Sequence, residues 1–347
     1  MKKVLIIGPS PTRIGGVSAH ISRVTYLLRD KHDFDYIDEG RGKIKGFYNL
    51  RSFNIAPYFC KMRGADIVHI HSGVFILRTI HIVIAKKLFR KNVIVSIHRN
   101  LEMEGHIETT KRLLKQCNCA ILDSQVIYDS MFEKHSKCVY RMMPAFLPPI
   151  ESEEEQLPER VSAWIKKVRE DTSSILMCSN ASDIIDFNGV DLYGNDMCID
   201  SVRELNEMKN EKNFYLVLII HNTDRNPDKL KWYQEKIARE SCNNILLITS
   251  PVSFVQIMKA SDIVLRPTNT DGDSITRRGA LYYSKATVAS DCTKRPAGTY
   301  VFKTRDLEDF CNTILNALEL GPNQDKQSID YKAFYTNCYE KNSGVRK

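Results

Sequence analysis

The stretch DIVLRPTNTDGDSITRRGALYYSKATVAS (residues 262–290) contains a strand, a polar loop, a helix and a second strand in succession. The first apolar run ends at Arg266-Pro267, and a helix is expected to begin near Ser274, with the strand TVAS (287–290) behind it. Serine is a favoured N-cap residue because its hydroxyl accepts a hydrogen bond from a free amide of the first helical turn. Two buried strands joined by a helix predict parallel pairing, since parallel strands need a crossover connection.

Apolar runs rich in β-branched residues alternate with helix-length segments along the rest of the chain. Val17, Ile21, Val24 and Leu28 recur at helical spacing and predict a helix from about Gly16 to Asp30. Continuous apolar strands separated by helices are typical of parallel sheets covered on both faces. The expected strands are KVLIIG (3–8), FDYID (34–38), DIVHIH (66–71), NVIVSIH (92–98), CAILD (119–123), SSILMCS (173–179), FYLVLII (214–220), NILLIT (244–249), DIVLR (262–266) and TVAS (287–290).

Residues 144–158 hold four prolines and an acidic cluster, and they are interpreted as a linker. The chain is therefore expected to be an α/β protein with two doubly wound domains, residues 1–150 and 151–320. Residues 321–347 are expected to form a tail, helical and packed back on the first domain. Ligands of such sheets bind beyond the carboxyl ends of the strands, so two facing domains would enclose them in a cleft.

The composition excludes several classes of protein. Of the 347 residues, 43% are hydrophobic and 27% charged, which is typical of a globular chain and not of a disordered or fibrous one. The most apolar stretch, Val74 to Ala85, is interrupted by Arg78 and His81, so no membrane span is expected. The apolar run near the N-terminus is too short for a signal peptide, and the ten cysteines include no CxxC pair. These features predict a cytoplasmic protein with reduced cysteines.

The charge is distributed unevenly. Residues 1–150 carry 24 Lys and Arg against 12 Asp and Glu, a balance of +12, whereas residues 151–347 carry 26 against 30, a balance of −4. A basic half could face nucleic acid, anionic lipid or a phosphorylated substrate, or it could be an ordinary solvated surface. The basic residues are dispersed and no aromatic-interleaved basic motif occurs, which disfavours nucleic acid.

The loop GPSPTRIGGVSAH (8–20) leads from the first strand into a helix. Gly15 and Gly16 would let backbone amides approach an anion at the helix N-terminus, and Arg13 would add a positive charge. A tight turn with no ligand is the alternative interpretation. The loop lacks the GxGxxG pattern of nicotinamide-binding proteins.

Two strands end in histidine. His69 and His71 lie two residues apart, on one face of a strand. A metal site would need a third ligand, and the neighbouring sequence shows none. His71 and His98 are therefore expected to line a cleft, where His98 would contact a sugar or a phosphate; a purely structural role is the alternative.

The loop TNTDGDS (268–274) combines carboxylates with the start of a helix. Asp271 and Asp273 could bind sugar hydroxyls, while the helix N-terminus, Arg277 and Arg278 could bind phosphate charge. This combination suits a nucleotide-sugar. A capped helix with exposed charges would account for only part of it.

Together these motifs resemble glycosyltransferase family 4, whose members are retaining enzymes of the GT-B fold. The resemblance extends over nearly the whole chain, and RPTNTDGDS (266–274) is similar to a bacterial subgroup that builds surface polysaccharides. It rests on the Gly15-Gly16 loop, DIVHIH (66–71), His98, ASDIVLRPTNTDGDS (260–274) and VASDCTKRPAG (288–298).

The resemblance implies two Rossmann-like domains facing across a cleft, with the nucleoside diphosphate sugar bound mainly by the second. It implies catalytic roles for His98, near the C6 hydroxyl of the donor sugar, and for Asp271. It implies no cofactor and no catalytic metal, since helix dipoles and cationic side chains stabilise the leaving diphosphate. The implied donor-binding residues are Arg13, Gly15, Gly16, Arg266, Gly272, Asp273, Ser274, Arg277 and Arg278.

The expected activity is transfer of a hexose, with retention, to a lipid-linked or oligosaccharide acceptor in lipopolysaccharide or capsule synthesis. The basic first domain would carry the acceptor and contact the inner face of an anionic cytoplasmic membrane. Two departures favour an alternative, a catalytically weak partner subunit or scaffold. The Glu-x7-Glu pattern of the family aligns with Asp271 and Gly279, so a ribose contact is missing, and Asn188 stands where the family has lysine. A nucleotide-sugar epimerase is disfavoured because its site needs more acidic and histidine groups.

Overall fold

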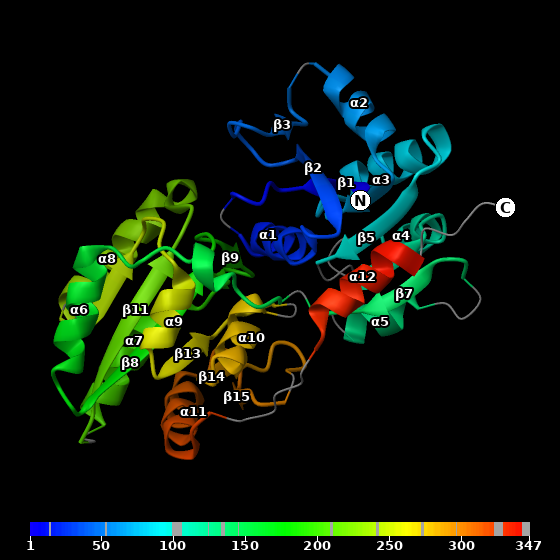
Figure 1. Cartoon of the computed structure of the whole chain (residues 1–347). Helices are drawn as coiled ribbons and strands as arrows, with labels where there is room; N and C mark the ends of the chain where they lie inside the picture. Colours follow the sequence, from blue (N-terminus) through cyan, green and yellow to red (C-terminus); the bar gives the residue numbers. More distant parts are fainter. Residues whose placement is uncertain are drawn as a thin grey trace. The chain divides into compact units, whose positions relative to one another are not determined.

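The computed structural model describes residues 1–13, 15–52, 54–98, 106–123, 125–132, 136–144, 146–208, 211–240, 243–271, 274–295, 297–322 and 329–341. The chain divides into two compact units (Figure 1). Unit 1 comprises residues 1–147 and 328–347, and unit 2 comprises residues 148–327. The boundary between them lies within the proline-rich stretch 144–158, and the C-terminal helix belongs to unit 1.

Unit 1 is built on a parallel sheet with the strand order β3-β2-β1-β4-β5-β6-β7. The inner strands are almost fully buried because helices cover both faces; Val4 to Ile7 of β1, for example, are at most 2% exposed. The strands are β1 (Lys2–Gly8), β2 (His32–Asp38), β3 (Tyr48–Asn49), β4 (Ile67–Ile70), β5 (Asn92–Ile97), β6 (Cys119–Leu122) and β7 (Val139–Met142).

Two apolar layers enclose this sheet. On one face Val4 and Ile6 pack with Ile21 of the first helix and with Tyr335 of the last, and Leu5 and Ile7 point into the other layer, as alternation along a strand requires. The helices of unit 1 are α1 (Gly16–Leu28), α2 (Ala56–Gly64), α3 (Phe75–Val83) continued by the π-helical turn η1 (Ile84–Leu88), α4 (Ile107–Leu114), α5 (Gln125–Met131) and α12 (Tyr331–Lys341).

Unit 2 repeats this plan with the parallel order β12-β11-β8-β13-β14-β15 and a small antiparallel hairpin, β9-β10. Its strands are β8 (Ser174–Ala181), β9 (Asp186–Phe187), β10 (Val190–Asp191), β11 (Asn213–Ile220), β12 (Ile245–Ile248), β13 (Ile263–Arg266), β14 (Ala286–Ser290) and β15 (Tyr300–Phe302). Its helices are η3 (Glu151–Glu153), α6 (Glu159–Arg169), α7 (Asn195–Glu207), η4 (Thr223–Arg225), α8 (Pro227–Glu240), α9 (Phe254–Ala260), α10 (Ile275–Tyr282) and α11 (Leu307–Leu320).

Each sheet has one point at which the strand order reverses, between β1 and β4 in unit 1 and between β8 and β13 in unit 2. Ligands of open parallel sheets bind beyond the carboxyl ends of the strands at such a point. The candidate site residues are therefore those that follow β1 and β4 in the first unit, and β8 and β13 in the second.

The ten predicted strands are all present, and the predicted helix after the first strand is α1. The short strands β3, β7, β9, β10 and β15 were not predicted, because two to four residues without a long apolar run carry little periodic signal. Among the described residues, no helix is long and apolar enough to cross a membrane. The nine described cysteines are all free, and most of them are buried.

Candidate functional site

A cluster of two arginines around one carboxylate lies at the switch point of unit 2. Arg266, the last residue of β13, places its Nε 3.3 Å from Asp271 Oδ2, and Arg295 places its Nη1 2.9 Å from the same oxygen. The three side chains are largely buried, with exposed fractions of 13% for Arg266, 2% for Arg295 and 9% for Asp271. The cluster carries one net positive charge and can attract an anion.

Buried partners hold both arginines in place. Arg266 donates to the carbonyl of Asn180 at the end of β8, and Arg295 donates from Nε to the Ser290 carbonyl at the end of β14. Burial raises the pKa of the Asp271 carboxyl, but the charges and hydrogen bonds of Arg266 and Arg295 outweigh it and leave the pKa below its ordinary value. Asp271 is therefore an ionised carboxylate at neutral pH.

The helix α10 begins beside this cluster, as the sequence predicts. The Ser274 hydroxyl accepts a hydrogen bond from the Arg277 amide, which confirms Ser274 as the N-cap. Arg277 is 1% exposed and donates to the Thr299 hydroxyl, so its guanidinium lies inside unit 2 and not at a solvent-facing position. Gly279 is buried in the second turn of α10. Gly272 and Asp273, two of the predicted donor-binding residues, lie outside the described residues.

A glycine brings a second helix close to the loop after β13. Gly194, which precedes α7, has a φ of +68°, and a Cβ there would lie 2.1 Å from the Pro267 carbonyl oxygen. Only glycine allows this approach.

The segment in which the family has a lysine is a tight hairpin in this chain. Asn188 and Gly189 have positive φ values of 52° and 79° and connect β9 to β10, which is the Asn-Gly pattern of a two-residue β-turn. Asn188 is therefore explained by turn geometry. Basic side chains reach this hairpin from elsewhere in unit 2, and both are paired: Arg225 with Asp183 at 2.5 Å and Lys229 with Asp186.

In unit 1, Arg13 holds a loop by means of a buried carboxylate. Its Nε and Nη2 donate to the two oxygens of Asp38, at 2.8 and 2.5 Å, and its Nη1 and Nη2 also donate to the carbonyls of Arg41 and Gly42. Asp38 itself is fully buried at the end of β2. Since these contacts engage both ends of the guanidinium, the structure gives Arg13 a positioning role in this loop. Its predicted contact with phosphate stays a prediction.

The Gly-Gly loop after β1 is a helix start. Gly15 is the N-cap of α1 with a φ of +149°, and α1 begins at Gly16. Among the described residues, no side chain makes a capping hydrogen bond at this end of α1. Binding of an anion by its first amides stays a prediction.

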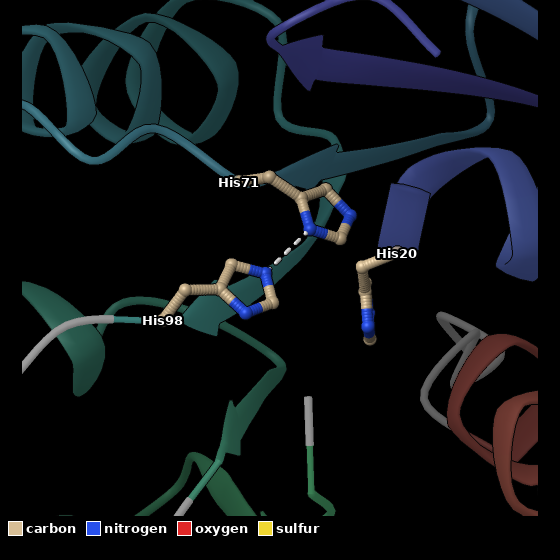
Figure 2. Close-up of side chains that lie close together, drawn as sticks. All are labelled: His20, His71 and His98. Atoms are coloured by element: carbon tan, nitrogen blue, oxygen red, sulfur yellow. Dashed lines mark hydrogen bonds between the residues drawn. The ribbon is translucent and has the colours of Figure 1, made fainter. Parts of the chain in front are cut away.

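Four histidines gather at the switch point of unit 1. His71 Nδ1 and His98 Nε2 are 3.0 Å apart, and their rings are nearly parallel, with an interplanar angle of 9°. His20, from α1, lies with its ring centroid 4.8 Å from that of His98 (Figure 2). His69 packs against His71 and has both ring nitrogens within hydrogen-bond distance of a hydroxyl, that of Tyr339 and that of Ser96.

Burial keeps the imidazoles of His69, His71 and His98 neutral. It lowers the pKa of His69 to about 3, and it lowers the pKa of His71 and His98 well below the ordinary value, with the neighbouring histidines adding to the effect. Neutral imidazoles can accept hydrogen bonds, donate them or ligate a metal ion.

The structure brings together some of the predicted site residues and adds others. Arg266, Asp271 and Ser274 lie at one edge of unit 2, and His71 and His98 at one edge of unit 1. Three residues of these sites, Arg295, Asp38 and His20, were not predicted, because their partners are distant in the chain. Arg295 points inward, whereas its neighbour Lys294 is exposed. The signal that could have revealed Arg295 was its place in the loop after a predicted strand.

The fold matches that of known glycosyltransferases. No protein-family model and no curated protein matches this sequence. HepE from Anabaena, in complex with UDP and glucose, superposes with a TM-score of 0.67 at 13% identity, covering 92% of this chain and 90% of HepE. The lipopolysaccharide outer core galactosyltransferase WaaB superposes with a TM-score of 0.61 at 14% identity over 97% of this chain and 99% of WaaB.

The trehalose-6-phosphate synthase OtsA, at 11% identity, has a TM-score of 0.66 over 99% of this chain and 96% of its own. At such low identity the likeness concerns the fold alone. The chain is an α/β protein of the GT-B fold.

Proposed function

We propose that this chain is a glycosyltransferase that uses a nucleoside diphosphate sugar as donor, and that unit 2 binds the donor. The observation that carries the proposal is the buried cluster of Arg266, Asp271 and Arg295 at the start of α10, on the switch point of a GT-B domain. The cluster combines a net positive charge for a diphosphate with an ionised carboxylate for sugar hydroxyls. Similar folds hold UDP and glucose in HepE, so UDP-hexoses are the first donors to test.

In this proposal the first amides of α10 and the loop that contains Gly272 and Asp273 receive the donor. Arg266 stabilises the charge that develops on the leaving diphosphate, and the more deeply buried Arg295 holds Asp271 in place. The acceptor oxygen attacks the anomeric carbon on the face from which the diphosphate leaves, and the departing phosphate oxygen takes the acceptor proton. The anomeric configuration is thereby retained. His98 contacts the donor sugar near its C6 hydroxyl.

We further propose a lipid-linked saccharide acceptor, bound by unit 1 at an anionic membrane surface, in the assembly of lipopolysaccharide or capsule. One face of α3 supports this placement, because Ile76, Ile80 and Val83 follow each other at helical spacing and are 66%, 44% and 39% exposed. The exposed side chains of Lys87 and Arg90 follow directly. An apolar face with adjacent basic residues is suited to the interface of an anionic bilayer.

A second candidate, a catalytically weak partner subunit, has one observation in its favour. Gly279 is buried in α10 where the resembling family carries the carboxylate that holds the donor ribose. Such a subunit would keep the fold and lose donor binding.

Isothermal calorimetry and donor-hydrolysis assays over a panel of nucleotide-sugars distinguish the two candidates. For the glycosyltransferase, at least one donor should bind and be slowly hydrolysed, and Arg266→Gln should weaken its binding about tenfold, the loss of one charge-assisted hydrogen bond. Arg169→Gln is the matched control, because Arg169 pairs with Asp262, which lies just before β13, at the opposite end of that strand from Arg266. If no donor binds to the parent chain, the partner-subunit candidate is preferred.

A further inference from the structure

The three histidines at the switch point of unit 1 come from three separate elements. His20 lies in α1, His71 follows β4 and His98 follows β5, and Figure 2 shows their side chains gathered at one place. One potential ligand nitrogen from each of them lies within 4.8 Å of the others. The sequence places His69 and His71 close together and shows no third ligand nearby. The fold brings two further histidines to His71: His20, which lies 51 positions before it, and His98, which lies 27 positions after it.

The spacing of the nitrogens is close to that of a metal site. Two nitrogens bound to one tetrahedral zinc ion at 2.0–2.1 Å are about 3.3 Å apart. His71 Nδ1 and His98 Nε2 are 3.0 Å apart, so these two rings need to separate only slightly to admit an ion between them. The third nitrogen, from His20, reaches the same distance by a small rotation of its side chain, since it starts within 4.8 Å.

The surroundings of the rings also suit an ion. His71 is 1% exposed, and its Nε2, like the buried Nδ1 of His98, has no hydrogen-bond partner among the residues that the structure describes. Because no partner fixes the proton of either ring on one nitrogen, each ring can carry its proton on this outer nitrogen and offer the other nitrogen to an ion. His20 Nε2 lies 3.1 Å from the hydroxyl of Tyr335 in α12. An outer partner of this kind orients a histidine that ligates through its other nitrogen.

We propose that His20, His71 and His98 form a binding site for one divalent transition-metal ion of the zinc class. Imidazole nitrogens suit Zn²⁺, Co²⁺, Ni²⁺ and Cu²⁺, whereas Mg²⁺ and Ca²⁺ take oxygen ligands. Binding at Nδ1 of His71 and Nε2 of His98 replaces their mutual hydrogen bond, and the proton of that bond moves to the other nitrogen of the same ring, so that both ligands are neutral imidazoles. Three protein ligands leave a fourth position for water or another oxygen ligand. The proposal does not rest on the glycosyltransferase activity, and it gives His98 the role of a metal ligand in place of the contact with the donor sugar proposed above.

Titration of the metal-free full-length chain with Co²⁺, followed by displacement with Zn²⁺, tests the site. The expected result is binding of one equivalent of Co²⁺ with the strong visible absorption of a tetrahedral ion. The near-ultraviolet band of a thiolate ligand should be absent, and its absence would exclude the exposed thiol of Cys60 as a ligand. His71→Gln and His98→Gln should each weaken binding by about 100-fold or more. Tyr335→Phe should weaken it about tenfold, because it removes only the outer partner of His20.

The exposed His106 provides the matched control, and His106→Gln should bind like the parent. X-ray absorption on the zinc-loaded parent needs no variant, and should show three imidazole nitrogens at about 2.0–2.1 Å. The proposal is overturned if no stoichiometric binding occurs, if the bound ion shows a sulfur ligand, or if binding survives in folded His71→Gln and His98→Gln proteins.

Discussion

Replacing Asp38 with asparagine tests whether one buried carboxylate holds the first loop of unit 1. Asp38 accepts hydrogen bonds from two groups of Arg13, from the amides of Ser10 and Gly40, and from the side-chain amide of Asn49, at distances of 2.5 to 3.1 Å. Asparagine keeps the shape but turns one acceptor oxygen into a donor. One of the groups that donate to Asp38 then faces the side-chain NH₂ of the asparagine, which is itself a donor. The Arg13 guanidinium also loses its counter-charge.

The expected loss of stability is about 3–5 kcal/mol, the usual cost of removing one partner from a buried ion pair. The pKa of Asp38 gives an independent measure. Burial raises it, but the hydrogen bonds from Arg13, Gly40, Ser10 and Asn49 outweigh burial and hold it at about 2, against an ordinary 3.8. This difference is worth about 2 kcal/mol for the charged form. Because the folded-state pKa is lowered, this stabilisation is present above about pH 4 and is lost as the pH falls towards 2.

Urea unfolding at neutral pH measures the effect, provided that the two units are followed separately. Both tryptophans, Trp164 and Trp232, lie in unit 2, so their fluorescence follows that unit. Hydrogen exchange of peptides from β1 and β2 follows unit 1, and the free energy of opening of these peptides should fall by the stated amount while the fluorescence transition stays in place.

Asp35→Asn is the matched control. Asp35 lies in the same strand and pairs with Lys61, but both side chains are one-quarter exposed, so the variant should lose less than about 1 kcal/mol. Gly40→Ala provides a second perturbation, since its Cβ would lie 2.0 Å from Arg13 Nε and force the guanidinium away from Asp38. If Asp38→Asn costs no more stability than Asp35→Asn, the buried carboxylate of Asp38 does not hold the loop.

Three further predictions follow from the charges and surfaces described above. Lowering the pH of the metal-free protein from about 7.5 to about 5.5 should destabilise unit 1. Burial lowers the pKa of His69 to about 3 and those of His71 and His98 well below the ordinary value, while the unfolded chain takes up protons near pH 6.5. Stability that is present above pH 6.5 is then lost by about 1.4 kcal/mol per histidine at pH 5.5, and a flat pH profile of hydrogen exchange in β4 and β5 would contradict this. Gly279→Glu should tighten donor binding about tenfold if the glycine merely lacks a ribose contact, and it should abolish donor binding if the glycine makes room for the donor. Asp271→Ala should weaken donor binding in either case. If calorimetry finds the same donor affinity for Asp271→Ala as for the parent, Asp271 does not belong to the site. The double variant Ile76→Ser with Ile80→Ser should reduce cosedimentation with anionic vesicles severalfold, and added salt should reduce it further. Leu320→Ser, which changes an equally exposed residue of unit 2, should have no effect. Equal binding of the parent to neutral vesicles would rule out the electrostatic contribution.

Much of the architecture can be read from local patterns. Runs such as VLII in β1 and LVLII in β11 are apolar throughout, and this is possible only where both faces of a strand are covered, so they predict parallel sheets in an α/β fold. The start of α10 was equally predictable, because an N-cap hydroxyl acts on the amide three residues away. Both signals depend on residues that are close together in the chain.

The side-chain clusters could not be predicted in this way. Arg295 reaches Asp271 across 24 positions, Arg13 reaches Asp38 across 25, and Tyr335 reaches His20 across 315. The first two pairs exist because the strand order brings the carboxyl ends of particular strands, and the loops that follow them, to one edge of a sheet. The third exists because α1 and α12 pack side by side on one face of the sheet of unit 1.

The amino-acid sequence by itself thus determined ten of the strands, the starts of α1 and α10 and the two-unit parallel architecture, since these depend on burial and hydrogen bonding over a few residues. Only the tertiary structure decided that Arg13 pairs with Asp38 and that two arginines pair with Asp271. It also decided that His20, His71 and His98 lie close together. The physical reason is that an ion pair or a ligand set forms between atoms 3 to 5 Å apart, and distances between remote residues are set by the order in which the strands assemble.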